Sequence, residues 1–257
     1  MSHAAALART RVFPAALGIG SIALAIALVE VLIRTGYINR FIVPMPSEIA
    51  LALPRIVMEE NVLSRFALTM AESISASVLV AIFVIAGGVL LYRFDLLRRA
   101  TETWVAAVAA APLVLIYPLY LVIFGRNATT IVMMGFTAGI APTVLKTLEG
   151  LSGTRRVLIN VGRSFKLSPS QQFWKILFPS ALPTIFVGLR LGIIFALINI
   201  VGVEFLINFG GLGQLINELS ERYDLAGTYA AICFVVLVSV LVFVAMERLE
   251  RWLRPVD

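Results

Sequence analysis

Six long apolar stretches dominate the pattern of hydrophobic and polar positions along the chain. A bilayer core about 30 Å thick requires roughly 20 apolar residues to be crossed as an α-helix, and each stretch approaches or exceeds that length. We therefore predict an all-α, polytopic membrane protein with one transmembrane domain over residues 1–257 and six transmembrane helices. The predicted spans cover residues 12–33, 74–91, 104–124, 128–145, 182–203 and 225–246.

The composition agrees with lipid, rather than water, as the main solvent. Hydrophobic residues make up 60% of the chain and charged residues only 14%, which excludes a water-soluble globule and a disordered chain. The first stretch is longer than the roughly 7 to 15 apolar residues of a signal peptide, so we expect it to be kept as a span. One cysteine, Cys233, excludes an intramolecular disulfide.

The net charge of +6 has two interpretations, a nucleic-acid surface or the positive-inside bias of a membrane protein. With a cytoplasmic amino terminus, the inner segments hold fourteen Lys and Arg residues and the outer segments six, while Arg190 lies within a span. This asymmetry predicts that both termini face the cytoplasm. The sequence contains no basic segment with interleaved aromatic residues, so we expect no nucleic-acid partner.

Three prolines, Pro112, Pro118 and Pro142, lie inside the predicted spans. In lipid, a backbone hydrogen bond lost at proline must be recovered from a neighbouring helix or a water-lined cavity. These prolines are therefore candidates for kinks beside a transport pathway. An alternative of equal weight is that prolines are simply commoner in membrane helices than in soluble ones.

The polar loop of residues 146–182 carries helix-start and helix-end signals. The segment Ser168-Pro169-Ser170-Gln171 has the form of a capping box, so we expect a short helix to begin there. An upstream helix over residues 155–165 would complete a helical hairpin. By composition alone, a plain interfacial hairpin is the favoured interpretation.

The helix that begins at the capping box has its own apolar face. Phe173, Ile176 and Leu177 recur at helical spacing. Pro179 and Pro183 follow, and we expect them to end this helix before the next span.

Several segments of the chain resemble the permeases of binding-protein-dependent ABC importers, and in particular their nitrate, sulfonate and taurine branch. The central one is the coupling loop, and the order and spacing of the others extend over some 200 residues. The matching segments are Asn160 to Lys166, Phe178 to Pro183, Gly188-Leu189-Arg190, Val43 to Glu48, Pro112 onward with Phe124-Gly125, Glu204, Gly211-Leu212-Gly213 and Glu247-Arg248.

The chain departs from the family's coupling motif at several positions. Asn160 stands where the family has glutamate, Val161 and Gly162 stand for two alanines, and Lys166 replaces a glycine. A residue with a Cβ costs roughly 1 to 2 kcal/mol in a left-handed turn. Either the turn at Lys166 has a conformation different from the left-handed one, or docking to the partner compensates for this cost. The lost glutamate removes a salt bridge, so the partner surface is expected to be adapted.

The resemblance implies a type I (MetI-like) ABC importer fold in a bacterial inner membrane. It implies two permease subunits, identical or paralogous, a periplasmic or lipid-anchored solute-binding protein, and two ATPase subunits that bind ATP and Mg. The solute would be nitrate, bicarbonate or a sulfonate such as taurine, or alternatively a thiamine-precursor or riboflavin-type heterocycle. The implied coupling surface comprises Asn160, Val161, Gly162, Arg163, Lys166, Ser168, Gln171, Phe173, Lys175 and Ile176.

The chain lacks the side chains for its own ATP or metal chemistry. No Gly-x-x-x-x-Gly-Lys-Ser/Thr sequence is present, so ATP should bind only to the partner subunits. His3 is the sole histidine, and a His- or Cys-based metal site or nucleophile is therefore not expected. We expect no cofactor, no metal and no enzyme activity in this chain.

Polar groups within or near the spans are candidates for the pathway, because such groups favour a cavity or another helix over lipid. The candidates are Tyr117, Tyr120, Asn199 and Glu204, with Thr137 or Thr143 as further options. Helix packing is the alternative for each of them, and a structural role is the alternative for the acids Glu72 and Glu204. Two rival classes stay open: an ATP-independent pore or structural subunit, and an intramembrane enzyme that uses these two acids.

Overall fold

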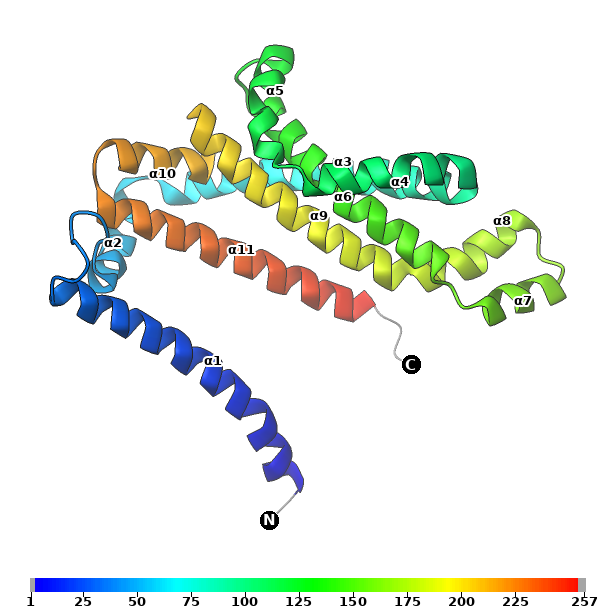
Figure 1. The fold of residues 1–257 in the computed structure, drawn as a ribbon, viewed down its shortest axis with the longest axis horizontal. Coiled ribbons are helices and arrows are strands. Elements are labelled where there is room, and N and C mark those ends of the chain that lie inside the picture. The colour runs from blue at the N-terminus through cyan, green and yellow to red at the C-terminus, as the bar shows by residue number, and fades with distance from the viewer. Residues whose placement is uncertain (1–2, 254–257) are drawn as a thin grey trace. The chain divides into compact units, whose positions relative to one another are not determined.

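The computed structural model describes the backbone of residues 3–253 and the side chains of residues 16–251. The side chains of His3, Arg9, Arg11 and Arg254 therefore lie outside the described residues. Every regular element within residues 3–253 is a helix (Figure 1), which confirms the all-α prediction. The chain forms two compact units, one of residues 1–61 and 219–234 and the other of residues 62–218 and 235–257.

The first unit contains α1 (His3–Arg34), α2 (Pro46–Glu59) and the start of α11 (Leu225–Leu253). Glu30 of α1 accepts hydrogen bonds from the backbone N–H and the hydroxyl of Ser47, at 3.1 and 2.9 Å. Glu48 accepts a bond from the backbone N–H of Met45 at 3.0 Å, as the third residue of an N-terminal cap. Carboxylates thus satisfy the free amides at the start of α2.

The second unit contains the helices that carry the candidate sites. Two of them, α6 and α9, run side by side (Figure 1), and α3 packs against both. The bounds are α3 (Val62–Arg93), α4 (Asp95–Ala110), the 3₁₀ turn η1 (Leu113–Ile116), α5 (Tyr117–Phe124), α6 (Ala128–Ser152), α7 (Arg156–Ser164), α8 (Pro169–Gln172), the π-helical turn η2 (Phe173–Leu177), α9 (Phe178–Ile207) and α10 (Gly211–Glu221).

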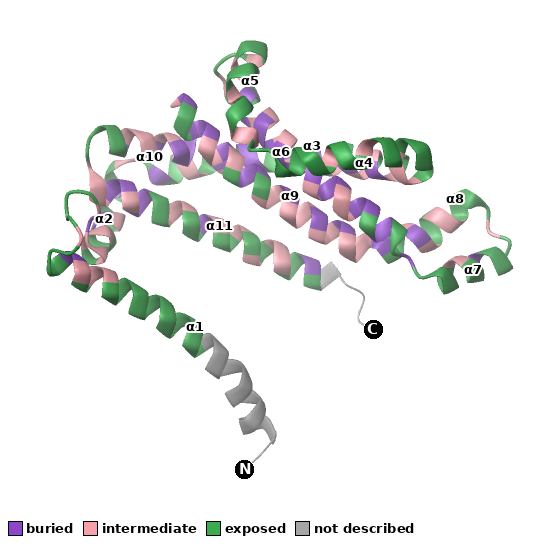
Figure 2. Ribbon diagram, in the orientation of Figure 1, coloured by how far each residue is buried: buried purple, intermediate pink, exposed green. Residues whose placement is uncertain are grey.

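Close approach of backbones holds α6 against α9. A Cβ on Gly139 would lie 3.0 Å from the carbonyl oxygen of Gly192, and a Cβ on Gly192 would lie 2.2 Å from the hydroxyl of Thr143. Small residues allow such contacts between membrane helices. Buried residues accordingly concentrate along α6 and α9, whereas α1 and α4 are exposed along most of their described lengths (Figure 2).

The predicted span 104–124 is not one helix. Among the residues that the structure describes, five helices are long and apolar enough to cross a membrane. A sixth candidate is the pair formed by α4 with residues Leu113–Phe124, which bends by 92° at the break. Ala111 is extended, with ψ of 141°, and Pro112 follows it. Proline disfavours the α conformation in the residue before it, and here the helix ends at Ala110.

The other predicted spans underestimate their helices. α3 begins at Val62 rather than residue 74, and α6 continues to Ser152 rather than residue 145. Beyond the apolar part of α6, Lys146 pairs with Glu149 at 2.6 Å. Hydropathy marks where lipid ends, whereas a helix continues as long as its backbone bonds and side-chain pairs are made.

Candidate functional site

The predicted hairpin between α6 and α9 is present. α7 corresponds to the predicted helix 155–165, and the capping box at Ser168 is confirmed. The Ser168 hydroxyl accepts a bond from the backbone N–H of Gln171 at 3.3 Å, and the Gln171 side chain accepts one from the backbone N–H of Ser168 at 2.9 Å. Gln172 also donates to the carbonyl of Ile159 at 3.1 Å, which ties the two arms together.

Three of the residues predicted for ATPase coupling face the inside of the protein. A Cβ on Gly162 would lie 2.5 Å from Cδ1 of Ile176, so the missing side chain is what lets the two arms meet. Phe173 packs against the cluster of Leu151, Ala181 and Ile185. Gly162 and Ile176 therefore hold the two arms together, and Phe173 packs the hairpin against α6 and α9.

The turn after α7 is left-handed despite its lysine. Lys166 has a φ of +52°. The backbone N–H of Lys166 bonds to the carbonyl of Arg163 at 2.9 Å, and that of Leu167 bonds to the carbonyl of Gly162 at 3.1 Å. These two bonds define a Schellman C-cap, which glycine normally occupies. Of the two explanations given for Lys166, the one in which the turn is not left-handed is therefore wrong.

An apolar stripe that the sequence analysis missed lies on the outside of the hairpin. Val157 and Val161 of α7 and Phe165, which directly follows it, recur every four residues and are 69%, 46% and 76% exposed. Trp174 is 60% exposed. The signal for it was the same periodicity that revealed the spans, here in a short polar helix. The remaining predicted coupling residues are all exposed too, namely Asn160, Arg163, Lys166, Ser168, Gln171 and Lys175.

The prediction that Pro179 and Pro183 end the helix is wrong. Pro179 lies in the first turn of α9 and Pro183 lies inside it. Before them, η2 widens the helix, and the backbone N–H of Phe178 bonds to the carbonyl of Phe173, five residues back. The wider turn shifts the carbonyls with which the ring of Pro179 would collide in a regular α-helix, so the chain continues as one long helix.

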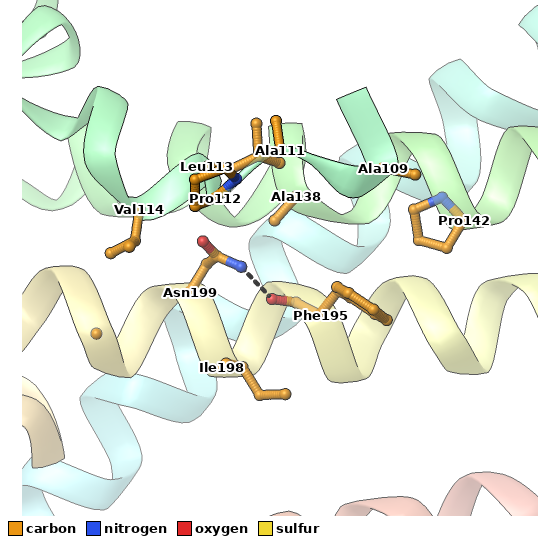
Figure 3. Close-up of a pocket in the computed structure, with 11 residues that line it drawn as sticks. Ala109, Ala111, Pro112, Leu113, Val114, Ala138, Pro142, Phe195, Ile198 and Asn199 are labelled. Carbon is orange, nitrogen blue, oxygen red and sulfur yellow. Dashed lines mark hydrogen bonds between the residues drawn. The ribbon is translucent and has the colours of Figure 1, made fainter. Parts of the chain in front are cut away.

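A cavity of about 390 Å³ opens between η1, α6 and α9 (Figure 3). Asn199 is its one amide side chain; its Nδ2 donates to the carbonyl of Phe195 at 3.0 Å, which leaves the amide oxygen as an acceptor. No charged residue lines this cavity. The lining residues are Ala109, Ala111, Pro112, Leu113, Val114, Ala138, Pro142, Phe195, Ile198, Asn199 and Gly202.

Of the four main pathway candidates, only Asn199 lines this cavity. Tyr117 and Tyr120 pack against a buried cluster that includes Ile131 and Ile200. The Tyr120 hydroxyl bonds to that of Thr137 at 2.6 Å.

The main candidate Glu204 and the further option Thr143 are buried elsewhere in the unit. Thr143 donates to the carbonyl of Gly139 at 2.8 Å. Glu204 lies at the far end of α9 from the hairpin and is completely buried. Of the cavity lining, sequence reasoning had named Pro112, Pro142 and Asn199. It missed the other lining residues because nothing distinguishes them from the rest of the spans.

Arg190, the one cation within a predicted span, is engaged inside the protein. Its guanidinium pairs with Glu250 at 2.9 Å and lies over the ring of Phe243, 5.2 Å from the ring centre. The pair is largely buried, with side-chain exposures of 19% and 6%. Arg190 thus links α9 to α11 and does not face the cavity.

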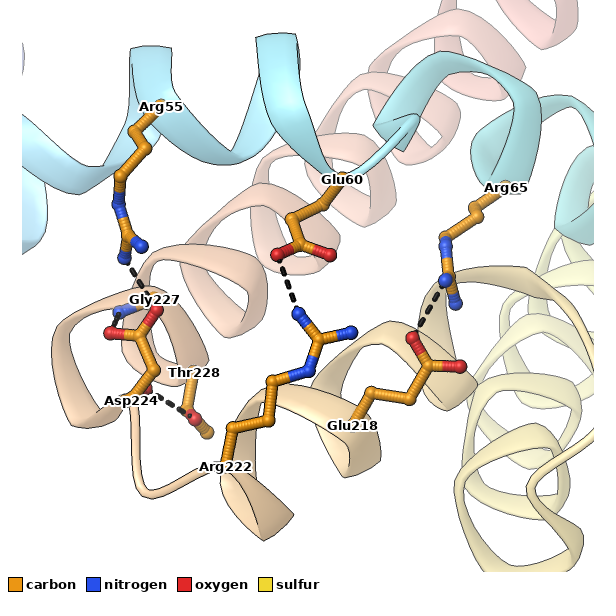
Figure 4. A network of polar contacts seen from close by, with 8 residues as sticks. All are labelled: Arg55, Glu60, Arg65, Glu218, Arg222, Asp224, Gly227 and Thr228. Atoms are coloured by element: carbon orange, nitrogen blue, oxygen red, sulfur yellow. Dashed lines mark hydrogen bonds and ion pairs between the residues drawn. The ribbon is translucent and has the colours of Figure 1, made fainter.

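Ion pairs also order the connecting segments within each unit (Figure 4). In the first unit, Arg55 pairs with Asp224 and Arg222 pairs with Glu60. Burial by itself would raise the pKa of Asp224, but the backbone N–H of Gly227, at 2.9 Å, and the Arg55 guanidinium outweigh it and lower this pKa. In the second unit, Arg65 pairs with Glu218 at 2.7 Å.

Comparison with known proteins identifies the class. Residues 77–255 match the family described as binding-protein-dependent transport system inner membrane component. The chain belongs to this family and is therefore a permease subunit of an ABC importer.

It is 22% identical to the taurine transport system permease protein TauC of Escherichia coli, over 93% of this chain and 89% of that one. It is 25% identical to the formylaminopyrimidine transport permease protein ThiX of Halalkalibacterium halodurans, over 82% and 85%. Its fold resembles that of a chain in the inward-facing MetNI methionine ABC transporter, with a TM-score of 0.68 at 19% identity, over 77% of this chain and 98% of that one.

Proposed function

We propose that the hairpin of α7, α8 and η2 docks onto a separate ATPase subunit, which binds ATP and Mg, and that the cavity beside Asn199 belongs to the solute pathway. A second permease subunit, identical or paralogous, would complete that pathway. A solute-binding protein would deliver the solute on the opposite side of the membrane from the hairpin. This arrangement has both chain termini in the cytoplasm of a bacterial cell.

The exposed apolar stripe of α7 is the observation that carries the proposed docking. Fully burying one side chain of this size contributes about 1.5 to 3 kcal/mol, so three residues at helical spacing suit a groove on a partner protein. Cations flank the stripe, with Arg163 and Lys166 on α7 and its turn and Lys175 on η2. We therefore expect an apolar groove with an acidic rim on the ATPase.

Serine substitutions at Val161 and Phe165 test this docking. Both side chains are exposed, so the variants should fold and melt like the parent but lose co-purification with the ATPase and solute-stimulated ATP hydrolysis. Leu96→Ser is the matched control, because Leu96 is 84% exposed on α4, outside the hairpin. Undiminished co-purification of Val161→Ser and Phe165→Ser together would contradict the proposal.

The proposed solute is small, with taurine and related sulfonates as the first candidate class because of the long match to the taurine permease. A heterocycle of the pyrimidine type is the second candidate. The uncharged, apolar lining around Asn199 favours it, since an anion would gain no ionic contact there.

Uptake into proteoliposomes that contain the whole importer distinguishes the two classes. We expect labelled taurine to accumulate in an ATP-dependent manner and formylaminopyrimidine not to compete. The reverse result would select the heterocycle, and uptake without ATP would contradict the coupled mechanism itself. Asn199→Leu should reduce uptake of the true solute, because it removes the acceptor in the cavity.

A further inference from the structure

Two acids and a threonine are buried together at the end of α9 that lies farthest from the hairpin. Thr69 and Glu72 lie three residues apart on α3 and so share one face of it. Glu204 lies on α9. Their exposed fractions are 0%, 3% and 0%. None of them lines the cavity beside Asn199, and none belongs to the hairpin.

Glu204 and Thr69 together cap the first turn of α10. One carboxylate oxygen of Glu204 accepts a bond from the Thr69 hydroxyl at 2.7 Å, and the other accepts the backbone N–H of Gly213 at 2.8 Å. The Thr69 oxygen in turn accepts the backbone N–H of Leu212 at 2.9 Å. Amides in the first turn of a helix have no carbonyl partner within it, and a carboxylate satisfies them with favourable charge.

Two glycines permit this capping. A Cβ on Gly211 would lie 2.0 Å from a carboxylate oxygen of Glu204, and a Cβ on Gly213 would lie 2.2 Å from the carbonyl oxygen of Val201. Gly211 also has a φ of +68°. The Gly211-Leu212-Gly213 segment therefore brings the start of α10 directly onto the carboxyl group of Glu204.

Glu72 lies one helical turn beyond Thr69, whose hydroxyl bonds to Glu204, so it faces Glu204 where α3 packs against α9. Neither of its oxygens has a hydrogen-bond partner among the described residues. The nearby cations are engaged elsewhere. Arg65 of α3 pairs with Glu218 of α10, and Arg126 donates to the carbonyls of Ile207 and Asn208.

The charges of α6 lie toward its other end, where Lys146 pairs with Glu149. No ion pair within residues 16–251 includes Glu72 or Glu204. Two carboxylates buried side by side without a cation cannot both stay ionised.

We propose that Glu72 and Glu204 bind one proton between them, with Glu72 as the carboxylic acid and Glu204 as the carboxylate, and that this acid pair fastens the first turn of α10 to α3 and α9. The assignment of the proton follows from geometry, because both oxygens of Glu204 already accept hydrogen bonds and those of Glu72 do not. Release of this proton to the solvent places a second negative charge in the buried site and loosens the cap.

Isosteric substitutions test the asymmetry of the pair in the complete importer. Glu72→Gln imitates the protonated acid without having to take up a proton on folding, so its melting temperature at neutral pH should equal or exceed the parent value. Glu204→Gln replaces one accepting oxygen by an amide N–H₂ group, which then faces the Thr69 hydroxyl or the Gly213 N–H, both of them donors. It should lower the melting temperature and raise hydrogen exchange at Leu212 and Gly213 roughly tenfold or more, as expected for one lost charge-assisted hydrogen bond. Glu149→Gln, at a largely exposed acid, is the control and should change neither quantity.

The pH dependence and an infrared spectrum supply independent readouts. A proton that only the folded state holds stabilises fully below the ordinary pKa of a glutamic acid, about 4.3. This contribution is lost progressively as the pH rises from there, so the parent should lose stability between acid and alkaline pH more steeply than Glu72→Gln. The parent should also show a protonated-carboxyl C=O band that Glu72→Gln lacks. Absence of that band, equal effects of the two glutamine variants, or stabilisation by Na⁺ at fixed pH would overturn the proposal. The infrared difference keeps the test valid even if Glu204→Gln does not fold.

Discussion

Lys166→Gly should strengthen the C-terminal turn of α7. Lys166 adopts a φ of +52°, where a residue with a Cβ loses roughly 1 to 2 kcal/mol. Glycine removes that strain, but it also lowers stability by roughly 0.4 to 1 kcal/mol because it gives the unfolded chain more conformational entropy. The difference is about 0.8 kcal/mol in favour of glycine, or a factor of roughly four in an equilibrium constant.

Hydrogen exchange measured by mass spectrometry reports this turn, because the Leu167 amide bonds to the Gly162 carbonyl across it. We expect exchange at Leu167 to slow by about fourfold in Lys166→Gly, if the amide exchanges through local opening. Lys166→Ala is the matched control, since it removes the charge and keeps the Cβ. Equal protection in the two variants, or faster exchange in the glycine variant, would refute the argument from backbone strain.

Three further predictions concern packing, a buried ion pair and pH. Gly162→Ala should destabilise the hairpin by about 1 to 3 kcal/mol, because its Cβ would lie 2.5 Å from Ile176. Hydrogen exchange of α7 measures this loss. Gly87→Ala is the control and should be neutral, since a Cβ there has no atom within 4 Å. Glu250→Leu should lower the free energy of unfolding by about 3 kcal/mol, because it leaves Arg190 without its carboxylate. Adding Arg190→Leu to the same chain should recover most of this loss. If the losses of the two single variants simply add in the double variant, the pairing is contradicted. Asp224 has a pKa below its ordinary value of 3.8, so its contribution is present above that value and is lost as the pH falls through the lowered pKa. Thermal melts between neutral and acid pH should therefore show a smaller acid loss in Arg55→Met than in the parent, and an unchanged acid limb would argue against the Arg55 contact.

The sequence predicted best what depends on neighbouring residues. The Ser168 capping box and the helix before it were found because a cap requires particular side chains three residues apart. The proline pattern was less informative, since Pro112 ends a helix, Pro142 lies inside one and Pro179 begins one. Local chemistry is the same in each case, and the surrounding packing decides which outcome occurs.

The candidate sites were predicted less completely. Family resemblance located the coupling loop, but it did not separate the interior residues Gly162 and Ile176 from the exposed stripe around Val161. It also did not show that Asn199 faces a cavity while Tyr120 bonds to Thr137. Which face of a helix is covered depends on the partner helix, and that information is not contained in the helix itself.

The amino-acid sequence by itself determined the all-α membrane class, the positions of the apolar helices and the importer family, because these follow from apolar length, charge distribution and short motifs. Only the tertiary structure decided that Thr69 and Glu204, 135 residues apart, meet over the start of α10. A contact of that kind arises from the packing of α3 against α9, where close backbone approach sets which polar groups are buried together. No local property of either segment specifies it.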